Sequence, residues 1–418
     1  MRPAAAPSPD PPLPDGVTRR AGLYVHVPFC GAICPYCDFA VRRGGDDAKR
    51  AYVDALGREI ALTRAHLDRL GARDDPPPLR DALPFDTLYL GGGTPSALDD
   101  AQLTTIVETL RAALPIADDA RLFLEANPED VTPARLAHWR ALGVATLSLG
   151  SQRLDDRALA FLGRHHRGDD VRRVVDQVRA AAIDTLSLDL IYGLPDEAEA
   201  DAQAAWTREL DAVGALDIDH VSAYQLAVEP GTVFGKRAAR GALTPLADGA
   251  QAIAFHLTHA RLAAAGLAPY EACSFARAPH HRSRHNRKYW HHVPYVGLGP
   301  SAHSFDGRVR WWNERHLPRW QRALAADAPP IADRETIDAV AGATESLLLG
   351  LRTVHGVDPA TIERRWRVTL IAANRDRFAA WADAGLIARR ADDRLVPTRD
   401  GLAVADGLAA SCAIAPAA

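Results

Sequence analysis

A repeated strand–helix pattern constrains the fold of this chain more than any other feature. From residue 22 to about 228, short β-branched apolar runs alternate with segments of helical period. Strands that are joined by helices run parallel, and the connecting helices cover the sheet. The pattern predicts an α/β fold, namely a closed or partly open β/α barrel. The expected strands are 22–29, 86–91, 121–126, 145–150, 185–193 and 219–226, and the expected helices are 48–70, 99–113, 133–142, 155–162, 168–182 and 199–213.

Unusual polar residues follow the predicted strands, always at the same end. In β/α barrels the chemistry gathers where strands end and the next loops begin. We therefore expect one functional site at this end of the barrel. In strand order, the residues are Cys30, Cys34 and Cys37, then GGGTPS (91–96), EANP (125–128), GSQ (150–152), and Asp189 with GLP (193–195).

The cysteines favour a metal centre. The chain has five, and three of them form the C-x3-C-x2-C stretch CGAICPYC at Cys30, Cys34 and Cys37. An odd, clustered set in a large chain argues against a disulfide framework. Three thiolates at this spacing are typical of a [4Fe–4S] cluster whose fourth iron is left open. The alternative is structural zinc, which usually takes four protein ligands.

Composition narrows the class of protein. Hydrophobic residues make up 47% of the 418 residues and charged residues 24%, as in globular proteins. A net charge of −4 gives no reason to expect nucleic-acid binding over a broad surface. No apolar run is long enough to span a membrane, and the Pro-rich start lacks the apolar core of a secretory signal. We therefore expect a cytoplasmic protein with a disordered tail at 1–21.

The cysteine motif followed by GGGTP on the next strand resembles the radical S-adenosylmethionine (SAM) superfamily. Further stretches resemble its oxygen-independent coproporphyrinogen III dehydrogenase-like family over nearly the whole chain. These are YVHVPFCGAICPYCDF, LYLGGGTPS, EANPED, LSLGSQ, LGRHH, LDLIYGLP, HVSAYQLAVEPGT and ATESLLLGLR. The resemblance implies a partial (β/α)6 barrel at 22–230, a barrel extension at 231–330, and a mostly helical, winged-helix-like domain at 331–418.

The resemblance also implies the roles of individual residues, although it assigns no catalytic residue. The cluster would be held by Cys30, Cys34 and Cys37, and SAM would chelate its open iron. Position 153 is Arg where the family usually has Ser, and residues 196–198 also depart from the family pattern. The residues expected to bind SAM are Tyr24, Tyr36, Gly93, Thr94, Glu125, Gln152, Arg164 and Asp189.

The stretch HHRSRHNRKYWHH (280–292) gathers five histidines beside Tyr289 and Trp290. Its HNRKYW portion resembles the motif of the HemW branch, the heme chaperones, as do YEACSFA (270–276) and VGLGPSAHSF (296–305). The resemblance implies that His285 ligates heme iron, a common role for imidazole. Tyr289 and Trp290 would then wall the macrocycle. Arg282, Arg284 and Arg287 would meet the propionates, and the rival ligands are Cys273, His303 and the solvated His280, His281, His291 and His292.

Three functional hypotheses follow. The first is a heme chaperone that passes heme to acceptor hemoproteins, respiratory enzymes in particular, without decarboxylase activity; a homodimer is compatible with this. The second is a coproporphyrinogen III dehydrogenase, but Phe39 stands where those enzymes have a fourth cysteine and the N-terminal region is short. The third is nucleic-acid binding by the winged-helix-like segment, which its charge-balanced RRADDR stretch disfavours.

Overall fold

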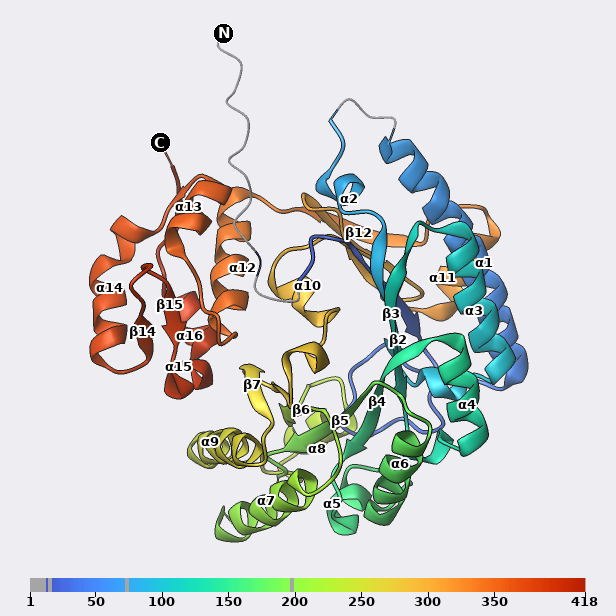
Figure 1. Cartoon of the computed structure of the whole chain (residues 1–418), viewed down its shortest axis with the longest axis horizontal. Coiled ribbons are helices and arrows are strands. Elements are labelled where there is room, and N and C mark those ends of the chain that lie inside the picture. The colour runs from blue at the N-terminus through green and yellow to red at the C-terminus, as the bar shows by residue number, and fades with distance from the viewer. Residues whose placement is uncertain (1–12, 14–16, 72–74, 196–198, 418) are drawn as a thin grey trace.

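The computed structural model describes residues 13, 17–71, 75–195 and 199–417, and confirms the predicted α/β fold (Figure 1). Within these residues, twelve strands form one sheet in the order β12-β11-β10-β9-β1-β2-β3-β4-β5-β6-β8-β7. The six predicted strands are its centre, and all run parallel. They are β1 (Gly22–Val27), β2 (Phe85–Gly92), β3 (Ile116–Ala126), β4 (Val144–Gln152), β5 (Thr185–Tyr192) and β6 (His220–Gln225).

The predicted crossover helices lie along the outer side of the curved sheet (Figure 1). Local sequence sets their ends. Helix α3 begins after Asp99, whose side chain accepts from the Gln102 amide while the Gln102 side chain accepts from the Asp99 amide. Helix α4 ends at Gly143, which has a φ of 94°. The crossover helices are α1 (Asp46–Gly71), α3 (Asp100–Ala113), α4 (Pro133–Leu142), α5 (Asp156–Phe161), α6 (Gly168–Ala180) and α7 (Glu199–Gly214).

The sheet continues beyond the six predicted strands on both sides. Strand β9 (Tyr295–Leu298) pairs in parallel with β1, and β10 (His303–Phe305), β11 (Val309–Asn313) and β12 (Ile331–Thr336) follow in antiparallel order. At the other side, β8 (Ser274–Ala276) and β7 (Ala268–Glu271) add an antiparallel pair to β6. The sheet is therefore a partly open barrel rather than a closed one. The helices in this part are α2 (Pro78–Asp81), α8 (Val233–Ala238), α9 (Asp248–Ala264), α10 (Asn286–Trp290) and α11 (Leu317–Ala325).

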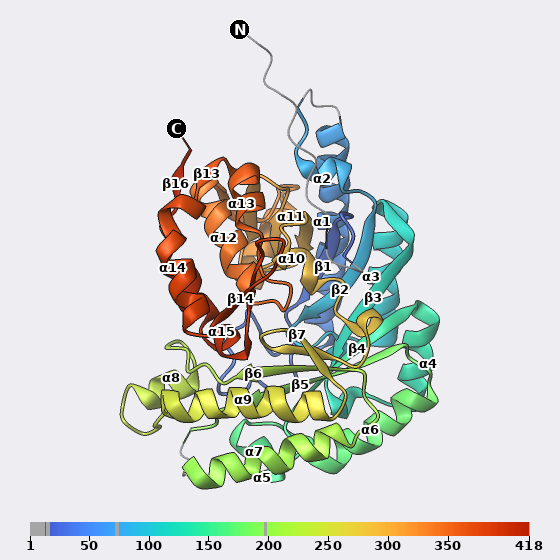
Figure 2. The same cartoon turned by 60° about the vertical axis from the view of Figure 1, so that its left-hand side comes forward.

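The C-terminal part is mostly helical and has its own apolar core, which includes Leu347 and Trp381. Its elements form one group, and α12 contacts α10 (Figure 2). Because β12 belongs to the main sheet, this helical group begins at α12 rather than at residue 331. The elements are α12 (Ala339–Leu351), α13 (Pro359–Trp366), β13 (Val368–Thr369), α14 (Ile371–Asp383), β14 (Ile387–Arg389), β15 (Leu395–Pro397), α15 (Arg399–Ala403), α16 (Ala405–Ala410) and β16 (Ala415–Pro416).

Most of the tail predicted at 1–21 lies outside the described residues. The end of this segment, near Thr18 and Arg20, is bonded to the barrel. The Thr18 hydroxyl donates to Asp86, and the Arg20 carbonyl accepts from Lys288. Across the described ranges, we find no helix that is both long and apolar enough to cross a membrane.

Candidate cluster and cofactor site

A cavity of about 540 Å³ lies at the carboxyl ends of the parallel strands. Most of the residues predicted from the strand ends or implied by the family resemblance meet there. Among the expected SAM contacts, Tyr24 is the exception, because it lines a neighbouring cavity of about 500 Å³ together with His26 and Glu125. The predicted residues that line the first cavity, called here the cluster cavity, are Cys30, Cys34, Tyr36, Cys37, Gly93, Thr94, Glu125, Gln152, Arg164 and Asp189.

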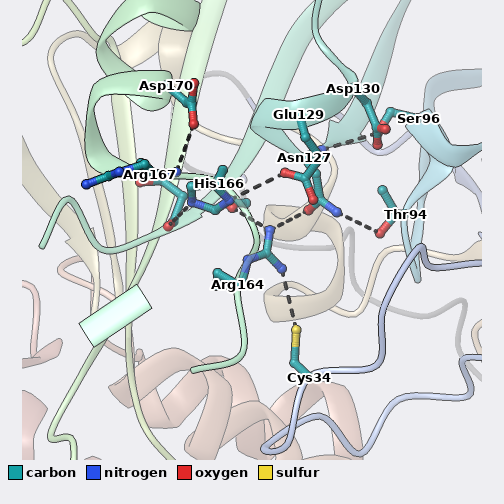
Figure 3. A network of polar contacts seen from close by, with 12 residues as sticks. Cys34, Thr94, Ser96, Asn127, Glu129, Asp130, Arg164, His166, Arg167 and Asp170 are labelled. Atoms are coloured by element: carbon teal, nitrogen blue, oxygen red, sulfur yellow. Dashed lines mark hydrogen bonds and ion pairs between the residues drawn. The ribbon is translucent and has the colours of Figure 1, made fainter. Parts of the chain in front are cut away.

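The cysteine loop after β1 presents its sulfurs to hydrogen-bond donors. The Thr94 hydroxyl donates to Cys30 Sγ at 3.5 Å. Arg164 Nη1 lies 3.6 Å from Cys34 Sγ (Figure 3). Burial raises the pKa of the Cys30 thiol to about 11. The thiol is therefore neutral in the protein alone, whereas iron would replace the proton and hold the thiolate. Donors aimed at the sulfurs fit the negative charge of a bound cluster.

The arrangement of the thiols bears on zinc as the alternative. In the part of the chain that the structure describes, no three His, Cys, Asp or Glu side chains are gathered around a point where one metal ion could sit. A single zinc ion needs such convergence, because all its ligands bind one atom. In an iron–sulfur cluster each cysteine binds a different iron, so its thiols stand farther apart. The described side chains therefore form no preassembled site for a single zinc ion.

Gly93 is required by the close approach of the chain to the cysteine loop. A Cβ at this position would lie 2.8 Å from the Phe29 carbonyl oxygen and 3.1 Å from Cys30 Sγ. The amides of Gly93 and Thr94 donate to the carbonyls of Val27 and Phe29, each at 2.8 Å. The GGGTP stretch is thus tied to the start of the cysteine loop, and a side chain at 93 would push the two apart.

Arg164 is held in place by a polar network that reaches three strand ends (Figure 3). Its Nη2 donates to Asn127 Oδ1 at 2.6 Å and to the Gly150 carbonyl at 2.9 Å. Asn127 Nδ2 in turn donates to the Thr94 hydroxyl at 3.4 Å. The sequence placed the EANP stretch at a strand end but did not single out Asn127. Its role depends on Arg164, which is 37 positions away, so local pattern could not identify it.

Two buried carboxyl groups face the same cavity. Glu125 accepts from the Tyr89 hydroxyl at 2.8 Å and from the Gly92 amide at 3.0 Å, and the Ser148 hydroxyl donates to Asp189 at 3.2 Å. Burial raises the pKa of Glu125 to about 7, with a further contribution from the charge of Asp189, and raises the pKa of Asp189 to about 6. A cationic ligand would favour the ionised forms, so the cavity is suited to positive charge.

The unusual Arg153 does not enter the cavity. Gln152 adopts a positive φ of 56°, and the chain turns so that Arg153 is buried on the other side. Its Nε lies 3.4 Å from a Glu209 carboxylate oxygen, and its guanidinium lies over the Trp206 ring at 5.1 Å. The departure from the family pattern at 153 therefore leaves the cavity lining unchanged. The departure at 196–198 lies outside the described residues.

The predicted heme ligand His285 is closed off from solvent. It directly precedes α10, and 1% of its surface is exposed. Its Nδ1 lies 2.8 Å from the Thr87 hydroxyl and its Nε2 lies 2.7 Å from the Tyr289 hydroxyl. Burial lowers its pKa to about 3, so the ring is neutral. Both ring nitrogens are thus engaged in this structure, and ligation of iron would require one hydrogen bond to open.

The neighbours of His285 are also built into the barrel. Lys288 is fully buried and pairs with Asp86 at 2.6 Å, and Arg284 lies 3.8 Å from the same carboxylate. The Trp290 ring packs on Tyr270, with ring centroids 5.8 Å apart. Arg282, expected to meet a propionate, lies over the Tyr270 ring. Two of the rival ligands also have structural surroundings, since His281 bonds to Thr185 and burial raises the pKa of Cys273 to about 12.

The fold and the cavity define a radical SAM protein. Residues 78–205 match the radical SAM superfamily. A crystal structure of Escherichia coli coproporphyrinogen III oxidase (HemN), described as a radical SAM enzyme, is similar to this fold with a TM-score of 0.76. The two chains are 22% identical, and the match covers 94% of this chain and 89% of that one. The superfamily implies SAM and a [4Fe–4S] cluster, and the cavity residues fit both.

Curated relatives narrow the class. Heme chaperone HemW of Mycobacterium tuberculosis (strain ATCC 25618 / H37Rv) is 37% identical, over 97% of this chain and 96% of its own length. Heme chaperone HemW of Bacillus subtilis is 30% identical over 87% of this chain and 92% of its own, and that of Escherichia coli is 32% identical over 71% and 74%. The chain belongs to the HemW family.

Proposed function

We propose that this protein is a heme chaperone, which binds heme and transfers it to acceptor hemoproteins, respiratory heme enzymes in particular. The observation that carries the proposal is the 37% identity to a protein named heme chaperone HemW over 97% of the chain. That span takes in the barrel, the α10 segment and the C-terminal helices together. Phe39, which stands two positions after Cys37 in place of a fourth cysteine, also favours a chaperone over a dehydrogenase.

The cluster cavity would hold the resident cofactors. In this proposal Cys30, Cys34 and Cys37 carry the [4Fe–4S] cluster, and the bound cluster supplies one-electron chemistry and an iron for SAM to chelate. Arg164 is placed to meet the SAM carboxylate, and Glu125 and Asp189 to meet its ammonium group or ribose hydroxyls. The remaining proposed SAM contacts are Tyr24, Tyr36, Gly93, Thr94 and Gln152.

The sequence-based prediction that His285 ligates heme carries a structural condition. Its Nε2 becomes available to iron only if the hydrogen bond to Tyr289 breaks, and its ring becomes accessible only if α10 moves. A solvent-exposed ligand would need neither change. His285 therefore stays a prediction, and repeating the heme titration described next with His285→Ala tests it.

The first test is an anaerobic titration of the cluster-reconstituted full chain with hemin, followed by Soret absorbance. We expect a saturable, red-shifted band at one hemin per chain. A linear response without saturation would contradict the chaperone function. A second step mixes the loaded protein with an apo-hemoprotein acceptor, and we expect the Soret band to change to that of the acceptor; a band that stays with the donor would contradict transfer.

The competing function is oxidative decarboxylation of coproporphyrinogen III, and the fold similarity to HemN is its support. An assay that supplies reductant, SAM and coproporphyrinogen III distinguishes this function from the chaperone function. We expect no porphyrinogen-dependent formation of methionine and 5′-deoxyadenosine. Product formation that depends on the porphyrinogen would assign the enzyme function instead.

A further inference from the structure

A further hollow lies beside the neighbouring cavity that Tyr24 lines, between the added strands β9–β12 and helix α12. It has a volume of about 520 Å³, within the range of small-molecule sites. Its walls include the rings of Tyr295, Phe305 and Trp312. Arg310 of β11 donates to Glu345 of α12 at 2.6 and 3.0 Å, so the C-terminal helices are tied to one wall of this hollow.

Shared lining residues place this hollow and the cluster cavity on either side of the neighbouring cavity of about 500 Å³. Tyr289, Tyr295 and His303 line both the hollow and the neighbouring cavity of about 500 Å³. Phe39 and Glu125 line both that cavity and the cluster cavity. The three spaces therefore form a row from the cysteine loop to β11. The hollow of about 520 Å³ and the neighbouring cavity of about 500 Å³ share His303, and we call these two spaces together the aromatic hollow.

His303 is an imidazole in this hollow that is open to a ligand. It is exposed on β10, and its ring stacks on Trp312, with centroids 5.6 Å apart and planes 25° from parallel. Neither ring nitrogen has a hydrogen-bond partner in the described part of the chain. Partial burial lowers its pKa, so the ring is neutral near pH 7 and a nitrogen lone pair is available for a metal.

A second imidazole in the same hollow has one nitrogen without a partner. His292 is buried, with 7% of its surface exposed, and its Nδ1 lies 4.0 Å from a Glu345 carboxylate oxygen, but its Nε2 has no hydrogen-bond partner within the described residues. A buried polar atom without a partner is unfavourable, which points to a ligand that supplies one. The other histidines nearby are engaged, since His26 bonds to Tyr24 and to the Ala40 carbonyl, and His285 to Thr87 and Tyr289.

We propose that the aromatic hollow is the heme site, with His303 as an axial ligand to the iron and His292 facing the same hollow. The proposal rests on the proposed heme-chaperone function and adds the place and the ligand. The flat rings of Tyr295, Phe305 and Trp312 suit a planar tetrapyrrole. An exposed ligand also suits a carrier, because an acceptor protein can replace it without unfolding the donor.

The test is the hemin titration repeated with His303→Ala and with His280→Ala as the matched control, an exposed histidine outside the hollow. We expect binding by His303→Ala to weaken about tenfold or more with an altered Soret position, and binding by His280→Ala to be unchanged. Far-ultraviolet circular dichroism and the thermal midpoint check that the fold is retained. A third variant, Leu349→Trp, fills the hollow from α12 without removing a histidine, and we expect it to weaken binding too.

The outcomes distinguish failure of the proposed chaperone function from failure of the proposed heme site. If the wild type shows no saturable binding, the chaperone function itself is contradicted. If the wild type binds hemin and both His303→Ala and Leu349→Trp bind it equally well, the function stands and the aromatic hollow is overturned. If only His285→Ala weakens binding while its fold is retained, the ligand is His285.

Discussion

The segment around α10 and the aromatic hollow beside it contain similar residue types in opposite surroundings. His285 is buried, and Thr87 and Tyr289 engage its two nitrogens. His303 is exposed, and its nitrogens have no such partner among the described residues. The difference teaches that a dense histidine motif need not mark an open ligand site. Buried polar groups are satisfied by the protein, whereas a ligand site requires a donor that the protein leaves available.

The largest effect on the free energy of unfolding is expected for substitution of Lys288, in the buried α10 region. Its ammonium group pairs with Asp86 at 2.6 Å and donates to the Arg20 carbonyl at 2.6 Å, fully inside the protein. Lys288→Ala leaves the Asp86 charge buried, so we expect the free energy of unfolding to fall by about 3–5 kcal/mol. Urea unfolding measures this. The exposed Lys236→Ala is the control, and equal effects of the two substitutions would show that the α10 region is not a closed structural unit.

The next-largest effect is expected at Glu125, which lines the cluster cavity. It concerns how the free energy of unfolding depends on pH. Its pKa is raised from 4.5 to about 7 in the folded protein, so the folded state holds this proton more tightly than the unfolded state. The resulting stabilisation is complete below pH 4.5 and is lost as the pH rises through 7, by roughly 3 kcal/mol. Glu125→Gln removes the titrating group, so the free energy of unfolding of the variant lacks this pH dependence.

Unfolding free energies of wild type and Glu125→Gln, measured from pH 5 to 8 without cofactors, test this sign. We expect wild type to lose stability relative to the variant as the pH rises. Because SAM is cationic, its binding to wild type should strengthen over the same range, and the strengthening should be smaller in the variant. Parallel stability curves would contradict the raised pKa.

The sequence predicted the central architecture and most of the cluster cavity. Strand period and helix period are local properties, so the six strands and their helices followed from the pattern. The cavity residues at strand ends followed because parallel strands bring their carboxyl ends to one edge, whereas Tyr36 and Arg164 were implied by the family resemblance. The surroundings of His285 did not follow, because Thr87 is 198 positions away. The aromatic hollow joins strands β9–β12 to α12, and such tertiary contacts leave no local period in the sequence.

A smaller difference in unfolding free energy is expected between alanine substitutions of the two histidines, His285 and His303. His285→Ala leaves the buried Thr87 and Tyr289 hydroxyls without a partner, so we expect a loss of about 1–3 kcal/mol in unfolding free energy. His303→Ala removes an exposed ring, and we expect a change within about 0.5 kcal/mol. Thermal and urea unfolding of both variants measure the difference. If His303→Ala destabilised the protein as much as His285→Ala, His303 would be part of the closed framework rather than of a ligand site.

The smallest effect is expected at Phe39, which is 70% exposed between the cluster cavity and the aromatic hollow. Because so much of its ring faces solvent, Phe39→Ala should change stability by no more than about 0.5 kcal/mol. A macrocycle that covers part of the ring would still lose about 1 kcal/mol of binding free energy, or roughly fivefold in hemin affinity. Ile331→Ala, at an exposed position on β12, is the control. If both substitutions weaken hemin binding equally, exposed apolar surface in general attracts hemin; if only Phe39→Ala does, the binding lies in the row of cavities between the cysteine loop and β11.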